Sequence, residues 1–341
     1  MPKEGYKLSV TPTLITVTAS QPNGFFYGVQ TIYQLLPPAV YGKELKKKAD
    51  WSVPAVEIED APRFVHRGLM LDVCRHYAPI EYIYKFIDLL AMNKMNVFHW
   101  HLTDDQGWRI EIKRYPELTA VGSIRKATVV RKEWGTYDGT PYGGFYTQDE
   151  IRDVVNYAAE RFITVIPEIE MPGHSEEVLA VYPHLSCAGK PHVYDDFCIG
   201  NDATFEFLEN VLEEVMELFP SEYIHVGGDE ATKKGWPTCP KCRARMQREG
   251  LKDVDELQSY LIHRIERFLN AHGRRLLGWD EILDGGLAPG ATVMSWRGTE
   301  GGLKAIRAGQ QAVFVPGEFC YLDYTQDAPF TQPVSYTHLT L

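Results

Sequence analysis

Acidic residues and tryptophans recur directly after short apolar segments of this sequence. The segment YIHVGGDE ends in Asp229 and Glu230, which follow two glycines. Adjacent acidic residues occur elsewhere in the chain, so adjacency alone is weak evidence. This pair differs because Gly227 and Gly228 leave room for a ligand close to the backbone. Two neighbouring carboxyl groups also shift each other's pKa, which suits general acid–base chemistry.

Similar polar groups follow the other apolar segments, and parallel strands would bring them to one rim. They are Asp72, His99, His101, Asp104, Asp105, Glu168, Glu170, His174, Trp279, Asp280, Glu281, Trp296, Arg297 and Glu318. The sequence has no serine in a G-x-S-x-G elbow and no cysteine with an evident activating partner. Acyl-enzyme chemistry is therefore not expected.

His99 and His101 permit a different chemistry. Two histidines at positions i and i+2 of a strand face the same way and could bind a metal ion. A metal-dependent hydrolase would then use an Asp or Glu elsewhere on the rim. The residues that follow, LTDDQGW, contain no further histidine. Structural histidines are the simpler interpretation, so we predict a site without metal or cofactor.

The apolar segments that position these groups alternate with helical patterns. They span residues 67–73, 96–102, 163–170, 223–230, 275–281, 292–298 and 312–318. Nearly continuous apolar runs separated by amphipathic helices indicate buried parallel strands. The pattern predicts a (β/α)₈ barrel of which seven strands are evident. The rival is an open doubly wound sheet, but no glycine-rich phosphate turn follows a strand.

Residues 1–60 have a different pattern. LSVTPTLITVTAS alternates like a strand or hairpin, and GFFYGVQTIYQLLPP reads as a helix stopped by Pro37 and Pro38. One hairpin and one helix cannot bury a core alone, so we expect part of a small α+β domain. Residues 42–54 are the predicted linker. The predicted catalytic barrel spans 61–326, and 327–341 form a tail of different character.

Composition excludes some partners. The chain of 341 residues has a net charge of −11 and no basic patch, so nucleic acid is not an expected partner. It contains no apolar run long enough to span a membrane, and MPKEGYKLSV lacks the apolar core of a signal peptide. The sequence leaves the oligomeric state undetermined.

The six cysteines do not form a recognisable framework. Cys239 and Cys242 form a CPKC motif, but no second pair follows at zinc-site spacing, so a structural zinc ion is not expected. Cys187 and Cys198 flank a loop and could form a disulfide in an oxidising compartment.

Several motifs together resemble the β-N-acetylhexosaminidases of glycoside hydrolase family 20. The resemblance rests on RGLMLDVCRHY, NVFHWHLTDDQGWRIEIKRYPELT, GGFYTQDEIRDVVNYAAERFITVIPEIEMPGH, YIHVGGDE, LLGWDEIL, VMSWRG and CYLDY, and it covers residues 20–326. It implies a retaining exo-glycosidase that removes terminal β-linked GlcNAc or GalNAc from glycans or chitooligosaccharides. In this mechanism the substrate's own acetamido oxygen attacks C1 and gives an oxazolinium intermediate. A non-catalytic sugar-binding homologue remains an alternative.

The resemblance also implies roles for individual residues. Glu230 matches the general acid and base, and Asp229 the residue that orients the acetamido N–H. Tyr321 matches the tyrosine that holds the acetamido oxygen. The substrate-binding residues implied are Arg67 for sugar hydroxyls, Asp323 for O4 or O6, Trp279 and Trp296 for the acetamido pocket, and Asp104 and His174 as polar support.

The sequence departs from the family pattern at two places. Glu170 stands where the family often has Asp, so its pairing with His174 is expected to differ in detail. The resemblance fades after Gln326, and PVSYTHLTL carries neither an eighth strand nor its sugar-binding residues. We therefore expect a barrel truncated before strand eight, with two open sheet edges. A glycan-directed enzyme is expected to be exported (periplasmic, secreted or cell-surface), with its signal upstream.

Overall fold

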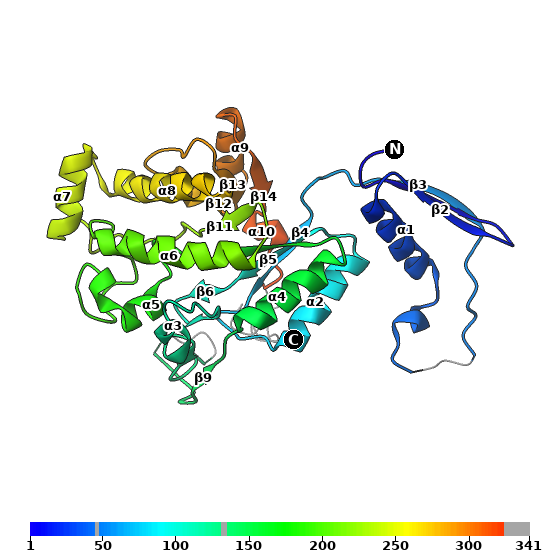
Figure 1. Cartoon of the computed structure of the whole chain (residues 1–341), viewed down its shortest axis with the longest axis horizontal. Helices are drawn as coiled ribbons and strands as arrows, with labels where there is room; N and C mark the ends of the chain where they lie inside the picture. The colour runs from blue at the N-terminus through cyan, green and yellow to red at the C-terminus, as the bar shows by residue number, and fades with distance from the viewer. Residues whose placement is uncertain (45–47, 131–134, 324–341) are drawn as a thin grey trace. The chain divides into compact units, whose positions relative to one another are not determined.

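The computed structural model describes residues 1–44, 48–130 and 135–323 (Figure 1). The chain divides into two compact units. The first contains residues 1–69, 81–98 and 154–164, and the second contains 70–80, 99–153 and the residues from 165 onward. The predicted tail, 327–341, lies outside the described residues.

A small antiparallel sheet forms the start of the first unit. Its strands are β1 (Tyr6–Val10), β2 (Ile15–Ala19) and β3 (Val56–Asp60), in the order β2-β1-β3. Alternation in β1 buries Tyr6, Leu8 and Val10 against α1 (Pro22–Leu35), which contributes Tyr27 to this core. A short 3-10 helix, η1 (Pro38–Tyr41), follows α1.

The predicted hairpin and helix of this region are confirmed, and the hairpin is β1 and β2. The prediction was incomplete, because β3 pairs antiparallel with β1 along its whole length. The sequence of β3, VEIED, has only two apolar residues, beside three acidic ones. Its pairing with a strand about fifty residues earlier is what makes it a strand, and a local pattern does not reveal this.

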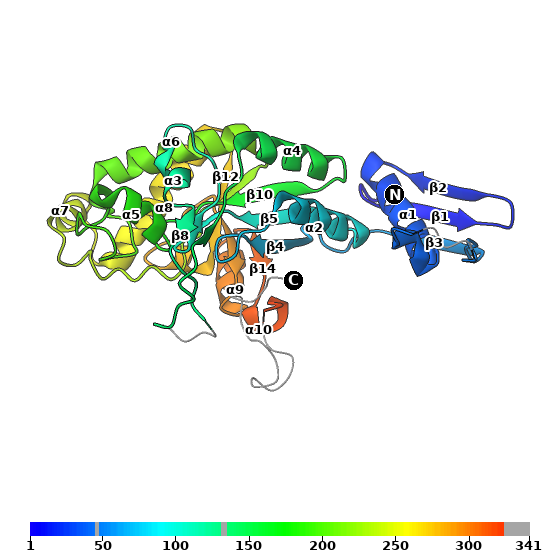
Figure 2. The ribbon, with the colours of Figure 1, turned by 90° about the horizontal axis from the view of Figure 1, so that it is seen from below.

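A seven-stranded sheet carries the rest of the fold. Its strands are β4 (Gly68–Asp72), β5 (Val97–His101), β10 (Thr164–Glu168), β11 (Tyr223–His225), β12 (Arg275–Trp279), β13 (Thr292–Ser295) and β14 (Ala312–Phe314). They lie in chain order, β14-β13-β12-β11-β10-β5-β4, and the pairs from β10 to β14 are parallel (Figures 1 and 2). All seven predicted strands are confirmed. Chain order in a curled parallel sheet is the barrel arrangement, not the doubly wound one.

Helices connect successive strands of this sheet. The main ones are α2 (Ile80–Met92), α4 (Gln148–Ala159), α6 (Asp202–Leu218), α8 (Val254–Ala271) and α9 (Glu300–Arg307). Helix α8 begins at Asp253, whose carboxylate accepts hydrogen bonds from the backbone N–H groups of Asp255 and Glu256. Among the described residues, no helix combines the length and apolar character needed to cross a membrane.

Shorter elements lie in the connections. The strands β6 (Thr103–Asp104), β7 (Gly107–Trp108), β8 (Ile124–Arg125) and β9 (Tyr142–Gly143) form two small hairpin sheets. The short helices are α3 (Glu117–Ala120), α5 (Glu176–Val181), η2 (Pro183–Leu185), α7 (Pro240–Glu249), η3 (Asp280–Leu283) and α10 (Gly317–Cys320). Every candidate site residue after β4 lies at the carboxyl end of a strand or in one of these connections, as a barrel site requires.

Candidate active site

The backbone after β11 is shaped by two glycines. Gly227 and Gly228 have φ angles of +65° and +98°, and Glu230 has a φ of +45°. A Cβ atom on Gly227 would lie 1.6 Å from Oε2 of Glu170. Glycine is therefore required here both for the left-handed backbone and for the space that the Glu170 carboxylate occupies. The strand has already ended at His225, which lets Asp229 and Glu230 turn toward the same imidazole.

His174 joins the acidic pair. Its Nε2 lies 3.4 Å from Oδ2 of Asp229 and 3.4 Å from Oε2 of Glu230, and its Nδ1 lies 3.3 Å from carboxylate oxygens of Asp104 and Asp105. Burial opposes the charge on this ring, but Asp104 and its neighbours outweigh burial and raise the pKa of His174. His174 thus lies among four carboxylates that favour its charged form, and it in turn lowers the pKa of Glu230.

The two carboxylates of the pair differ in their surroundings. The side chain of Glu230 is 58% exposed, whereas that of Asp229 is 15% exposed. Oδ1 of Asp229 is buried and has no hydrogen-bond partner among the described residues. A buried carboxylate oxygen without a donor is costly unless a ligand supplies one. Asp229 is therefore placed to accept a hydrogen bond from a ligand, and Glu230 to exchange protons at the solvent-facing side.

Asp104 anchors a network beneath this group. Its carboxylate lies 2.7 Å from Nη1 of Arg75 and 3.0 Å from Nε2 of His101. Burial raises the pKa of Asp104, but Arg75 and His174 outweigh burial, so the net pKa is lowered. Asp104 is thus a permanent anion that holds His174 charged, as the predicted supporting role requires.

Glu168 is the second fully buried anion of the network. Its carboxylate lies 2.5 Å from Nδ1 of His101, 2.8 Å from Nε2 of His99 and 3.0 Å from Nδ1 of His225. Burial lowers the pKa of His99 to about 4. Burial also disfavours charge on His101, but Glu168 and Asp104 outweigh it and raise that pKa to about 10.

These contacts bear on the metal alternative. Both ring nitrogens of His101 are within hydrogen-bond distance of a carboxylate, one of Glu168 and one of Asp104. A metal ion needs a free imidazole lone pair, and His101 has none in this charged, doubly bonded state. The geometry favours structural histidines over a metal-binding pair.

Glu170 does not make the contact expected of it. Neither oxygen of its carboxylate has a hydrogen-bond partner among the described residues, and its backbone N–H donates to Oγ1 of Thr103. Burial, together with Asp229 and Glu168, raises the pKa of Glu170 well above its usual value. His174 instead contacts the pair and two aspartates, and Glu170 is left as a buried carboxyl group without a hydrogen-bond partner among the described residues.

The arginine at the site is Arg75. It follows β4, its guanidinium contacts Asp72 at 2.9 Å and Asp104 at 2.7 Å, and it lines the cleft that contains Glu230. Arg67 precedes β4, and its donors are taken up by Glu4, Tyr27 and backbone carbonyl groups. The contacts of the Arg67 side chain are thus made within the first unit, and none of them supports the sequence-based role of Arg67. Its position at the amino end of a barrel strand was the signal against it.

The predicted aromatic walls lie on the following strands. The indole N–H of Trp279 donates to Glu168 at 2.7 Å, and its ring packs against His225. The indole N–H of Trp296 lies 3.0 Å from Glu281, and its ring stacks on Tyr321 with centroids 6.3 Å apart and planes 17° apart. The strand-end pattern included Glu281 but gave it no role.

Glu281 accepts from Trp296 and lies close enough to Asp229 for their charges to interact. Burial raises the pKa of Glu281 to about 7, and the nearby Asp229 adds to this rise. The donor on Trp296 opposes it. Asp323 lies beyond Tyr321, and its Oδ1 is buried without a hydrogen-bond partner among the described residues. Trp296 and Tyr321 thus stack on each other, and Asp323 follows Tyr321 two residues later in the chain.

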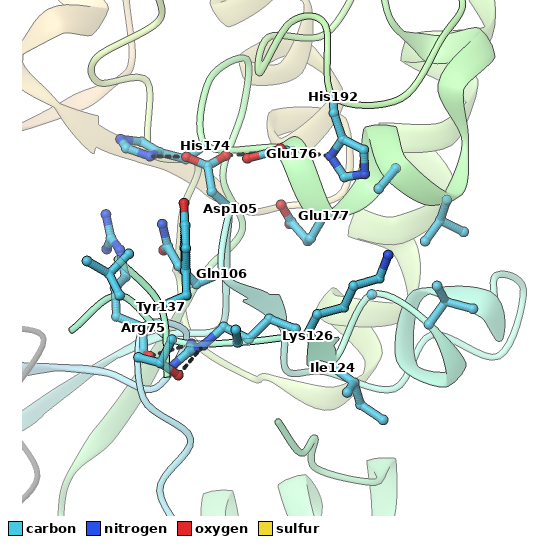
Figure 3. A pocket seen from close by; sticks show the side chains of 18 of the residues that line it. Arg75, Asp105, Gln106, Ile124, Lys126, Tyr137, His174, Glu176, Glu177 and His192 are labelled. Carbon is cyan, nitrogen blue, oxygen red and sulfur yellow. Dashed lines mark hydrogen bonds and ion pairs between the residues drawn. The ribbon is translucent and has the colours of Figure 1, made fainter. Parts of the chain in front are cut away.

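A cleft of about 850 Å³ opens beside Glu230 and His174 (Figure 3). His174, Asp105 and Glu176 lie along one of its sides. Arg75, Lys126 and Tyr137 lie along the other. Glu230 is among its lining residues, whereas Asp229, Trp279, Trp296 and Tyr321 are not.

A barrel with carboxylates, an imidazolium and tryptophans at the strand ends has the architecture of a glycoside hydrolase. The sequence pattern of the glycosyl hydrolase family 20 catalytic domain matches residues 64–340, and that of family 20 domain 2 matches residues 1–61. The chain therefore belongs to glycosyl hydrolase family 20.

Individual relatives agree with this family. The chain is 50% identical to a beta-hexosaminidase of Porphyromonas gingivalis over 98% of its own length and 43% of the relative's. It matches the crystal structure of a beta-N-acetylhexosaminidase from Bacteroides fragilis with a TM-score of 0.83 and 40% identity, over 96% of this chain and 64% of that one. It matches an exo beta-N-acetylglucosaminidase of Vibrio harveyi in complex with N-acetylglucosamine with a TM-score of 0.86 and 34% identity, over 98% and 54%. The chain spans about half the length of these relatives.

Proposed function

We propose that the protein hydrolyses terminal, non-reducing, β-linked N-acetylhexosamine from glycans or chitooligosaccharides. The observation that carries this proposal is the buried, unpartnered Oδ1 of Asp229 beside the exposed carboxylate of Glu230. A 2-acetamido group presents an N–H to this oxygen and, unlike a 2-hydroxyl group, also supplies the carbonyl oxygen that attacks C1. The Vibrio harveyi relative with bound N-acetylglucosamine supports the same sugar class.

The reaction we propose is retaining and substrate-assisted. Asp229 accepts the acetamido N–H, so that the acetamido oxygen attacks C1 and the nitrogen gains partial positive charge beside this carboxylate. Glu230 gives its proton to the leaving oxygen and afterwards removes one from the attacking water. In the free protein His174 lowers the pKa of Glu230, and a bound sugar that excludes water raises it toward the value a general acid requires.

The remaining side chains hold the sugar in this proposal. Trp296 and Trp279 wall the acetamido pocket, and the hydroxyl of Tyr321 donates to the acetamido oxygen. Arg75 binds the sugar hydroxyls in the role that the sequence suggested for Arg67, since its guanidinium is at the cleft. Asp323 accepts from a hydroxyl at O4 or O6 with its unpartnered oxygen.

The test compares nitrophenyl β-N-acetylglucosaminide with nitrophenyl β-glucoside as substrates of the chain and of Glu230→Gln. The matched control is Glu222→Gln, which removes an exposed carboxylate at the opposite end of β11. We expect Glu230→Gln to lower kcat/KM by roughly 10²–10⁴-fold and the control to have no effect. Activity on the glucoside without activity on the N-acetylated substrate would contradict the proposal.

Binding of a thiazoline mimic of the oxazolinium, measured by calorimetry, tests Asp229 without requiring turnover. Asp229→Asn turns one acceptor oxygen into a donor and removes the charge, so we expect the mimic to bind much more weakly. Unchanged binding would show that Asp229 does not hold the acetamido group. The configuration of the first product, followed by NMR, distinguishes retention from inversion.

A further inference from the structure

Four cysteines from two parts of the chain converge in the second unit. Cys187 follows η2, and Cys198 lies eleven residues later in the same loop. Cys239 precedes α7, and Cys242 lies in its first turn. Three of the four are buried, and Cys187 is partly buried. We call Cys187, Cys198, Cys239 and Cys242 the four-cysteine cluster.

The sulfur atoms of the cluster have the spacing of a tetrahedral metal site. Sγ of Cys187 lies 3.6 Å from Sγ of Cys242, and Sγ of Cys198 lies 3.7 Å from those of Cys239 and Cys242. All four sulfur atoms lie within 4.8 Å of one another. Thiolates about 2.3 Å from one central ion in a tetrahedron are about 3.8 Å apart. The observed contacts match that edge length.

The same distances do not describe disulfides. A disulfide bond is about 2.05 Å long and joins each sulfur to one partner. Here Cys198 contacts two other sulfur atoms, and so does Cys242. The disulfide considered between Cys187 and Cys198 is not formed, and all four residues carry free thiols. The four sulfur atoms therefore surround one point and are not joined in two disulfide pairs.

Gly200 lies against the cluster and contacts both Cys242 and the start of α7. The backbone N–H of Gly200 donates to Sγ of Cys242 at 3.4 Å, a contact that favours a thiolate. A Cβ atom on Gly200 would lie 2.1 Å from the carbonyl carbon of Lys241, so only glycine allows the loop to approach the start of α7 this closely. The loop and helix are therefore shaped around their contact at the cluster.

We propose that the four-cysteine cluster binds one zinc ion through four thiolates. Soft thiolate ligands in a tetrahedron select zinc over the hard cations. All four positions are filled by protein sulfur, so the site is structural and leaves no place for substrate or water. Each thiol loses its proton on binding, and the ion's two positive charges offset half of the resulting negative charge.

The zinc site would fasten the backbone that follows the catalytic pair. Between Cys187 and Cys198 lies Asp196, a buried residue whose carboxylate accepts from the backbone N–H groups of Thr232 and Lys233 at 3.0 Å and 2.7 Å. Thr232 comes two residues after Glu230. The ion thus ties the loop of Asp196 to α7 and, through Asp196, restrains the segment that carries Glu230.

The CPKC motif alone did not predict this site. Its partners lie upstream, and Cys187 and Cys198 are separated by ten residues and not by two. A second close pair after CPKC is therefore not needed for such a site, because the fold brings the two halves together.

Metal content of the purified full chain, measured by mass spectrometry, tests the proposal. We expect one zinc ion per chain, its loss in Cys198→Ser and in Cys242→Ser, and its retention in Cys320→Ser, which changes an exposed cysteine outside the cluster. Mercurial titration with a zinc indicator should release the ion in step with modification of the thiols. Because the serine variants could fail to fold, cobalt is also added to the reduced, zinc-depleted full chain, where thiolate-to-cobalt charge-transfer absorption is expected.

Several outcomes would overturn the assignment. One is a chain that contains no zinc and takes up neither zinc nor cobalt when reduced. Another is zinc that stays at full content in both Cys198→Ser and Cys242→Ser. A third is a denatured, unreduced chain in which only Cys74 and Cys320 react with a thiol reagent, since that result means two disulfides. Activity enters none of these measurements, so their failure is separate from failure of the proposed hydrolase function.

Discussion

Substitution of the two arginines that flank β4 tests which one serves the site. The guanidinium of Arg75 lies 2.7 Å from Asp104. Arg75→Lys keeps a positive charge beside Asp104 but loses the planar guanidinium with its paired N–H donors. Arg67→Lys makes the same chemical change at the residue that pairs with Glu4. The two variants are therefore matched in chemistry and differ in place.

The expected magnitude follows from the contacts. A hydrogen bond to a charged group contributes about 1.5–3 kcal/mol, so loss of one bond from Arg75 to the sugar raises KM or the dissociation constant roughly 10- to 150-fold. Arg67 donates to Tyr27, to Glu4 and to the carbonyl oxygens of Phe64 and Lys94. Its loss lowers the free energy of unfolding by about 1–3 kcal/mol and leaves sugar binding unchanged.

Steady-state kinetics on nitrophenyl β-N-acetylglucosaminide, calorimetric binding of N-acetylglucosamine and urea unfolding of both variants separate the two effects. The control is the unfolding free energy of Arg75→Lys, which should stay close to that of the parent because Asp104 keeps a cationic partner. A larger loss of sugar affinity in Arg67→Lys than in Arg75→Lys would refute the reasoning and restore the sequence-based assignment.

Three further predictions concern the ends of the strands. An alanine in the left-handed region costs ~1–2 kcal/mol, and Gly227→Ala should lower the free energy of unfolding by more than this because its Cβ meets a buried carboxylate. Gly250 is also left-handed (φ +69°) but its Cβ position is open, so Gly250→Ala should cost only that amount. Urea unfolding measures both. Between pH 4.5 and pH 7 the titration of Glu281 lowers the free energy of unfolding of the parent, and Glu281→Gln should show a smaller decrease over this range, measured by urea unfolding. Thr232→Val removes a hydroxyl donor to buried Asp196 and so loosens the segment that carries Glu230. It should lower kcat several-fold with little change in KM, and thermal unfolding of the same variant shows whether the fold is kept.

The direction of the Glu281 effect follows from proton binding. Its pKa is about 7 in the folded protein against 4.5 for an ordinary glutamate, so the folded state binds more protons between these values. The contribution of Glu281 to the free energy of unfolding is then largest below pH 4.5. It falls by on the order of 3 kcal/mol as the pH rises through 7. A pH dependence that is identical in the parent and in Glu281→Gln would show that this carboxyl group is not shifted. An unfolding free energy of Gly227→Ala equal to that of Gly250→Ala would likewise contradict the crowding argument.

The sequence by itself determined the barrel and the acidic pair. Strand and helix periods are local, and an apolar run that is buried on both faces is visible from its own residues. The order of such runs then fixes a parallel sheet with its site at the carboxyl ends. Gly227 and Gly228 are an equally local signal, because they directly precede Asp229 and Glu230 in the sequence and allow the turn at that point.

Tertiary structure alone decided which distant groups meet. Arg67 and Arg75 lie at opposite ends of one strand, and their contacts show that Glu4 holds the first while Asp104 holds the second. The strand β3 exists through its pairing with β1, and the four-cysteine cluster exists through the approach of a loop to α7. Contacts between residues far apart in the sequence depend on how loops close over the sheet. No local period or spacing encodes that closure, which is why these features appear only in the folded protein.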